Sequence, residues 1–315
     1  IIKLMISEPS DNINLHGYKD LFNHLKNLYD YEKLPNKIIF SGEYGIGKST
    51  FAYHLTNYIF SKEENDKYDF ENNIINKNNY SFNLVKKNSH PNFFLVSNDD
   101  DKLNIKVSKI REMITFSNKS SFNNAYKIIF IDNAEYLNIN SINALLKIIE
   151  EPNNKMLFFL IQNNKKKILD TLNSRCIKFN MFLENSEKIK IINKITNDNF
   201  FSSLNEDFKN FYNSPGTILL LNKIFVNNNI ENKITIENFL KLIINKSLYK
   251  KDFHVKENLP FFIELYFKKK LNLHFKKAEI YILYKYFLRK LSDCNKFNLD
   301  MESVLIEFNG KILND

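Results

Sequence analysis

Nine residues in the first part of the chain have the types and spacing that suit a phosphate ligand. Residues 42–50 read Gly-Glu-Tyr-Gly-Ile-Gly-Lys-Ser-Thr and fit the pattern G-x-x-x-x-G-K-[ST]. The glycines let the backbone direct its N–H groups at an anion, and a helix that begins here adds partial positive charge. In such a loop Lys48 contacts the β and γ phosphates, while the Ser49 hydroxyl binds Mg²⁺. The sequence therefore predicts a site for a nucleoside triphosphate, rather than a plain glycine-rich turn.

A second metal ligand is expected from Asp132, which follows the apolar run 128–131. A carboxylate at the end of a buried strand lies beside such a loop and binds Mg²⁺ directly or through water. The next residue is Asn133, where many ATPases of this kind have a glutamate. An amide can orient water but is a very poor base, so we expect hydrolysis at this site to be impaired by roughly 10²–10⁴-fold. Glu135 is expected to be a solvated turn residue that points elsewhere.

The elements that must position these residues are predicted by the apolar pattern. Continuous apolar runs predict buried strands at 38–40, 93–96, 128–131 and 157–161. Helical spacing of apolar residues predicts helices at 15–34, 51–59, 110–114 and 142–149, the last of them stopped by Pro152. Buried strands that alternate with helices are typical of an α/β fold with a parallel sheet covered on both faces. Ligands of such sheets bind at the carboxyl ends of the strands.

Two further regions differ from this alternation. Residues 61–90 are polar and rich in asparagine, and they predict a loop. From about residue 184 onward helical patterns dominate, for example at 239–243 and 280–291. A chain of 315 residues suggests two or three domains.

The composition limits the cellular compartment and the kinds of partner that we expect for this protein. No apolar run approaches the roughly 18 residues needed to span a membrane, and no signal-peptide pattern is present. The two cysteines, Cys176 and Cys294, form neither a disulfide framework nor a four-cysteine zinc site, which favours a reducing cytoplasm. The net charge of +9 only weakly indicates DNA contact, because the lysines are scattered. Only three basic residues are arginines, so each could have a bidentate role or be there by chance: Arg111, Arg175 and Arg289.

Several short segments together resemble the bacterial clamp-loader subunits of DNA polymerase III, over about residues 13–180. They are His-Pro-Asn-Phe-Phe at 90–94, Ile-Arg-Glu at 110–112, Ile-Asp-Asn-Ala-Glu at 131–135, Asn-Ala-Leu-Leu-Lys at 143–147, Glu-Glu-Pro at 150–152 and Ser-Arg-Cys at 174–176. The His-Pro segment and the Asp-Asn-Ala-Glu variant are closer to the delta-prime subunit than to the gamma/tau motor subunit.

The resemblance implies a fold and an assembly. The fold would be a P-loop AAA+ parallel-sheet domain at 1–183, a small helical lid domain at 184–247 and a C-terminal helical collar domain at 248–315. Clamp loaders are open rings of such subunits that use ATP to place a sliding clamp on primer–template DNA. The implied partners are the gamma/tau and delta subunits, the clamp and the DNA backbone.

The resemblance also implies roles for individual residues. Arg175 would act in trans as an arginine finger on the ATP of a neighbouring subunit. ATP with Mg²⁺ would be bound by Gly42, Gly45, Gly47, Lys48, Ser49, Thr50, Asp132 and Asn163, with Ser49 and Asp132 on the metal. Asn163 matches a polar sensor that can contact the γ-phosphate or water. The four-cysteine zinc module of the family is missing, so no zinc is expected.

Two alternatives remain. A gamma/tau-type motor ATPase would hydrolyse ATP itself, but motor subunits have a glutamate in place of Asn133 and an arginine in place of Thr217. An unrelated P-loop enzyme such as a nucleotide kinase would leave the Ser-Arg-Cys segment at 174–176 unexplained.

Overall fold

The computed structural model describes residues 8–98, 105–150, 155–164, 168–196, 200–209, 214–273, 277–297 and 299–313. Two compact units make up the chain. The N-terminal unit comprises the described residues of 5–191 together with 214–216, and the C-terminal unit comprises those of 192–213 and 217–315. Glu151 and Pro152 of the Glu-Glu-Pro segment, and with them the predicted helix stop, lie outside the described residues.

The N-terminal unit alternates strands with helices. Its strands are β1 (Lys37–Gly42), β2 (Phe93–Val96), β3 (Lys127–Ile131), β4 (Met156–Asn163) and β5 (Ile177–Met181). Its helices are α1 (Lys19–Asp30), α2 (Lys48–Phe60), α3 (Tyr80–Lys86), α4 (Val107–Asn118), α5 (Ile139–Glu150) and α6 (Asp170–Asn173), and α7 (Asn185–Thr196) begins here.

The five strands form one parallel sheet in the order β2-β3-β4-β1-β5. The strands that carry the two predicted halves of the site, β1 and β3, flank β4, so their carboxyl ends lie at the same edge of the sheet. The predicted α/β fold class with a parallel sheet is confirmed, including all four predicted strands.

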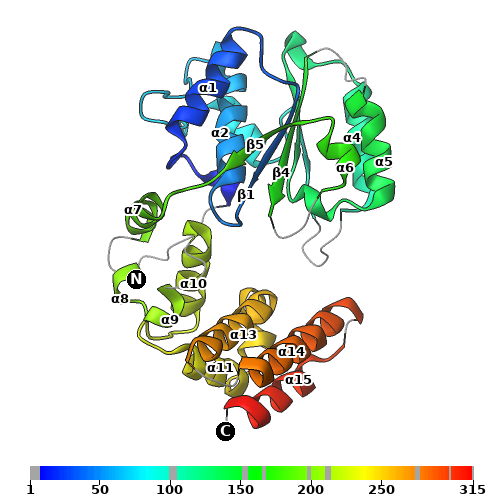
Figure 1. Ribbon diagram of the computed structural model, residues 1–315. Helices are drawn as coiled ribbons and strands as arrows, with labels where there is room; N and C mark the ends of the chain where they lie inside the picture. Colours follow the sequence, from blue (N-terminus) through cyan, green and yellow to red (C-terminus); the bar gives the residue numbers. More distant parts are fainter. Residues whose placement is uncertain are drawn as a thin grey trace. The chain divides into compact units, whose positions relative to one another are not determined.

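Apolar side chains cover both faces of this sheet. Ile38 and Phe40 of β1 pack into one core, whereas Ile39 between them packs into the other. Helices α1 and α2 lie on one face, and α4, α5 and α6 lie on the other (Figure 1). Strands buried on both faces are built of near-continuous apolar runs, which is why such runs predicted them correctly.

Strand β5, helix α3 and the short helix α6 of the N-terminal unit were not predicted. The edge strand β5 is largely exposed and has no continuous apolar run. The segment 61–90, predicted to be a loop, contains helix α3. This helix begins where the Asn79 side chain accepts a hydrogen bond from the backbone N–H of Phe82, at 2.6 Å. The loop prediction was therefore wrong for 80–86, because a cap rather than apolar periodicity starts the helix.

The described part of the C-terminal unit is helical. Its helices are the end of α7, α8 (Phe200–Ser203), α9 (Glu206–Lys209), most of α10 (Pro215–Asn227), α11 (Ile236–Asn245), α12 (Leu248–Lys251), α13 (Phe253–Leu273), α14 (Lys277–Phe297) and α15 (Met301–Phe308). One apolar core runs through them from Ile192 to Leu313. The division into lid and collar domains at 247 stays a prediction. None of the helices in the described part of the chain has the length and apolar character that a membrane crossing needs.

Candidate nucleotide-binding site

The phosphate loop connects the end of β1 to the start of α2. Gly45 and Gly47 both have left-handed backbone conformations, with φ of 79° and 90°. Such φ values favour glycine, because other residues pay a steric cost there. At Gly42 a β-carbon would lie 2.4 Å from the carbonyl oxygen of Met181 on β5. The three glycines therefore serve the geometry that the sequence pattern predicted.

Lys48, at the start of α2, is buried beneath this loop with 3% of its surface exposed. Its ammonium group donates to the carbonyl oxygens of Gly42 and Glu43, at 3.1 and 2.5 Å. Burial lowers the pKa of Lys48 to about 8, and the nearby carboxylates of Glu135, Asp132 and Glu43 partly oppose that shift. A cation in this position is available to phosphate oxygens entering the loop.

Ser49 and Asp132 meet across the site, as predicted. The Ser49 hydroxyl donates to Asp132 Oδ1 at 3.1 Å, and the backbone N–H of Asn133 donates to the same oxygen at 3.1 Å. Burial raises the pKa of Asp132, while the bond from Ser49 opposes the rise. A hydroxyl and a carboxylate are hard oxygen ligands, which suit Mg²⁺ with water completing its shell. Among the described residues, no three His, Cys, Asp or Glu side chains are grouped as a metal site of their own.

Three neighbours contact the outside of the loop. The backbone N–H of Gly216 donates to the carbonyl oxygen of Gly45 at 2.8 Å, and a β-carbon at 216 would lie 2.7 Å from the Gly45 Cα. The Lys188 ammonium pairs with the Glu43 carboxylate at 2.9 Å. The Thr50 hydroxyl accepts a longer hydrogen bond, 3.4 Å, from the Asn12 amide. Thr217 belongs to the C-terminal unit.

Asn163 ends β4, directly opposite Gly42 in the β1–β4 register. Its side-chain amide nitrogen donates to Asn133 Oδ1 at 2.8 Å and to Glu135 Oε1 at 2.9 Å. Its backbone N–H donates to Glu135 Oε2 at 3.2 Å. Glu135 is only 4% exposed, so the expectation of a solvated turn residue was wrong. The single turn of 3-10 helix at Ala134–Tyr136 folds this carboxylate back onto the end of β4.

Arg175 lies near the amino ends of the strands, whereas the phosphate loop lies at their carboxyl ends. It comes just before β5, whose Ile177 pairs with Ile38 near the start of β1. Gly42 is four residues further along β1, roughly 13 Å at about 3.3 Å per residue. The guanidinium is exposed and contacts Glu150 at the end of α5. The structure thus brings together the predicted loop residues, Asp132 and Asn163, and it keeps Arg175 apart from them.

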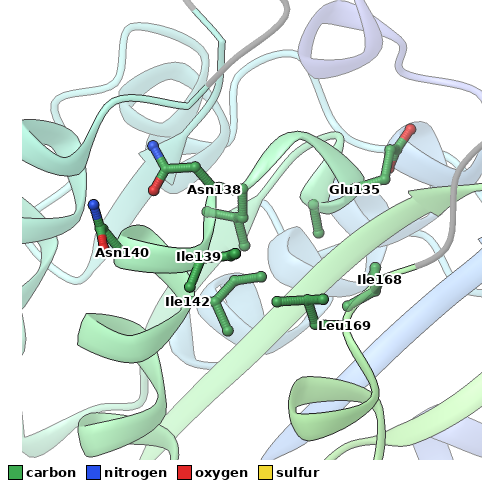
Figure 2. Close-up of a pocket in the computed structure, with 9 residues that line it drawn as sticks. Glu135, Asn138, Ile139, Asn140, Ile142, Ile168 and Leu169 are labelled. Atoms are coloured by element: carbon green, nitrogen blue, oxygen red, sulfur yellow. The ribbon is translucent and has the colours of Figure 1, made fainter.

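A cavity of about 620 Å³ opens next to Glu135 but is separate from the phosphate loop. Figure 2 shows Ile139 and Ile142 of α5 facing Ile168 and Leu169, which precede α6. The other lining residues are Ala134, Glu135, Leu137, Asn138 and Asn140. None of residues 42–50 lines it, so the cavity is not the nucleotide site.

Sequence reasoning missed Glu135, Gly216 and Glu150 as parts of the site and its surroundings. Glu135 and Glu150 belong to the segments at 131–135 and 150–152. Each of them contacts a predicted site residue, Asn163 or Arg175, that is distant from it in the sequence. Gly216 is one of six glycines in the chain. A glycine in a chain so poor in glycine signals a close backbone approach, and that signal could have identified it.

A family model and several curated relatives point to the same family. A family model described as "DNA polymerase III, delta subunit" matches residues 17–193, which is more than half of the chain. The DNA polymerase III subunit delta' of Pseudomonas aeruginosa is 30% identical over 95 residues, covering 30% of this chain and 29% of that protein. The subunit delta' of Buchnera aphidicola subsp. Schizaphis graminum is 29% identical over 198 residues, covering 59% of this chain and 58% of its own length. The chain therefore matches less than two thirds of the length of these relatives.

Among solved structures, a DNA polymerase III gamma subunit-related protein from Thermotoga maritima covers 90% of this chain and 96% of its own, with 14% identity and a TM-score of 0.47.

Proposed function

Because this chain belongs to the DNA polymerase III delta-subunit family, we propose that it works as a delta-prime-type subunit of a clamp loader in the bacterial cytoplasm. It binds ATP with Mg²⁺ at residues 42–50 and hydrolyses it poorly. It supplies Arg175 to the ATP site of a neighbouring subunit while the assembly loads a sliding clamp onto primer–template DNA. The resemblance to this family, first noted from the segments at 90–94 and 174–176, is confirmed.

The observation that carries the proposal is the separation of Arg175 from the phosphate loop of its own chain. The two lie at opposite ends of the strands of one parallel sheet, so Arg175 cannot reach a nucleotide bound at residues 42–50 of its own chain. An exposed arginine in that position is available to a second chain. Head-to-tail packing of subunits would then form each site from two chains.

The residues of the site have distinct tasks in binding. Lys48 and the backbone N–H groups of the loop would hold the phosphates, and Ser49 and Asp132 would hold Mg²⁺. When bound, the metal would neutralise part of the phosphate charge. Asn133 offers an amide where a base would be needed. The Glu135 carboxylate is engaged by Asn163, so it does not replace that base.

The alternative is a gamma/tau-type motor that hydrolyses ATP itself. It would need a base within reach of the attacking water. Since Asn133 is no base and Glu135 is turned onto Asn163, the described site favours nucleotide binding over turnover.

Two measurements test the proposal. In the first, the isolated chain is titrated with ATP and Mg²⁺ by calorimetry, with Lys48→Ala as comparison. We expect binding that Lys48→Ala strongly weakens, and very slow turnover. Rapid hydrolysis that depends on Lys48 would favour the motor alternative instead.

In the second, the chain is assembled with gamma/tau and delta subunits of its own organism, and the ATPase rate of the complex is measured. We expect Arg175→Ala to lower that rate by about 10³-fold or more, the typical contribution of an arginine finger. ATP binding by the isolated chain should not change. The matched control is Arg111→Ala, because Arg111 is also an exposed arginine and lies on α4, away from Arg175 in sequence. An unchanged rate with Arg175→Ala would remove the role in trans.

A further inference from the structure

Both N–H donors of the Asn163 side-chain amide are used within the protein. An asparagine amide nitrogen has two N–H donors. One of them meets Asn133 Oδ1 and the other meets Glu135 Oε1, at 2.8 and 2.9 Å. The carboxylate accepts a second bond from the backbone N–H of the same residue, at 3.2 Å.

The orientation of this amide follows from chemistry. A carboxylate only accepts hydrogen bonds, so the nitrogen of Asn163 rather than its oxygen must face Glu135. Because Glu135 holds both the backbone and the side chain of Asn163, the plane of the amide is fixed. Its second N–H then points to the position of Asn133 Oδ1.

A γ-phosphate carries oxygen acceptors and needs a donor. Asn163 has no donor left for it unless Glu135 or Asn133 gives way. The bond to Glu135 is charge-assisted, and such bonds are roughly twice as strong as neutral ones. Glu135 is 4% exposed and Asn163 is 7% exposed, so breaking their contact would leave a buried carboxylate without its donors.

We propose that Glu135 is a positioning residue that withdraws Asn163 from γ-phosphate recognition. The site then binds nucleoside diphosphates and triphosphates with no discrimination from Asn163. This inference rests on the proposed function only in that the site binds nucleotide. It changes the role expected for Asn163, from a sensor of the γ-phosphate to a strut between the ends of β3 and β4.

The test compares the Kd values of the full chain for ATP and ADP, both with Mg²⁺, and uses their ratio as the readout. A substitution that only disturbs the local structure weakens the binding of both nucleotides and leaves the ratio of the two Kd values unchanged. We expect Asn163→Ala to keep the ratio within about twofold of the wild type, because no hydrogen bond to the γ-phosphate is lost. Asn164→Ala, the adjacent residue that accepts from the Ser41 hydroxyl, is the control.

Glu135→Ala should release the amide and shift the ratio toward ATP by about tenfold, as expected for one hydrogen bond to a charged group. The double variant Glu135→Ala with Asn163→Ala should return to the wild-type ratio. Glu135→Gln is the second variant, for the case that the alanine variant does not fold. It keeps the volume and one acceptor, so it should give a smaller shift of the ratio in the same direction.

The outcomes separate this inference from the proposed function. A lower preference for ATP in Asn163→Ala would overturn it, because Asn163 would then already contact the γ-phosphate. Unchanged ratios in both Glu135 variants would also overturn it. If the wild-type chain bound neither nucleotide, the proposed nucleotide site would fail first, and the inference would fail with it.

Discussion

Arg175 is paired with Glu150 of its own chain: the guanidinium Nε and Nη2 atoms both lie 2.9 Å from the same carboxylate oxygen. The Nη1 group donates to the carbonyl oxygen of Thr171 at 2.9 Å. Two of the five guanidinium N–H donors therefore make hydrogen bonds, and the ion pair with Glu150 engages the Nη2 group as well. The arginine that the proposed function assigns to a neighbouring site is held in the isolated chain by an exposed acidic partner.

We expect Glu150→Ala to raise the ATPase rate of the assembled complex by up to about fivefold. An exposed ion pair is worth about 0–1 kcal/mol, and the arginine must give it up to reach a phosphate. The measurement is steady-state ATPase of complexes that contain wild type, Glu150→Ala or Glu150→Gln. A clear decrease with Glu150→Ala would mean instead that Glu150 orients Arg175 for its task.

The affinity for ATP should depend on pH through Lys48. Burial lowers the pKa of Lys48 to about 8, so its ammonium is charged below that pH and loses its proton as the pH rises through it. The charged groups nearby are Glu135, Asp132 and Glu43, which all favour the charged form. Since the protonated form of Lys48 attracts phosphate and its neutral amine does not, ATP affinity should be highest below about pH 8 and fall by up to about tenfold per pH unit above it.

Calorimetric titrations across this pH range check the prediction, with Lys48→Ala as the control. That variant should bind weakly and without the same pH dependence. A wild-type profile that stays flat through pH 8 would show that Lys48 is not the group that titrates.

Gly216 should be intolerant of a side chain. Its N–H donates to the Gly45 carbonyl, and a β-carbon would approach the Gly45 Cα to 2.7 Å and its oxygen to 3.0 Å. Both neighbours are backbone atoms, so the phosphate loop would have to shift. We expect Gly216→Ala to lower the free energy of unfolding by about 1–3 kcal/mol, the usual cost of overpacking, and to weaken ATP binding.

Gly310→Ala is the matched control, because a β-carbon there meets no atom within 4 Å. Urea unfolding followed by circular dichroism, together with ATP titration, gives both readouts. Equal stability and equal ATP affinity in the two alanine variants would show that the contact between Gly216 and Gly45 has no effect on the loop.

The sequence was sufficient to predict the centre of the sheet and the two halves of the site. Strands β1, β3 and β4 are buried on both faces, and that burial favours near-continuous apolar runs along them. The loop at 42–50 and Asp132 follow two of these strands directly. Their meeting at one edge therefore follows from the rule that parallel strands end together.

What the sequence could not predict depends on contacts between distant residues. Strand β5 pairs along β1 only, and its side chains are mostly exposed, so no periodicity reveals it. Glu135 becomes part of the site because a single helical turn folds it onto Asn163, 28 residues later. Such a contact leaves no local pattern in composition or spacing.

Helix α3 starts at two polar side chains, Asn79 and Glu64, rather than at a run with apolar periodicity. Asn79 is fully buried, and its Oδ1 accepts from the Phe82 N–H and from the Asn57 amide. Its own amide donates to Glu64 Oε2 at 2.7 Å. The same Glu64 carboxylate accepts from the backbone N–H groups of Tyr80 and Ser81, in the first turn of the helix.

We expect Asn79→Ala to lower the free energy of unfolding by roughly 2–4 kcal/mol. About 1 kcal/mol comes from the lost cap, and the rest comes from the Asn57 donor left buried without a partner. Asn78→Ala is the control, since that side chain is exposed. Hydrogen exchange across residues 80–86 should become faster in Asn79→Ala and stay unchanged in the control. Equal exchange in the two variants would mean that α3 is fixed by packing of Phe82 and Val85 rather than by its cap.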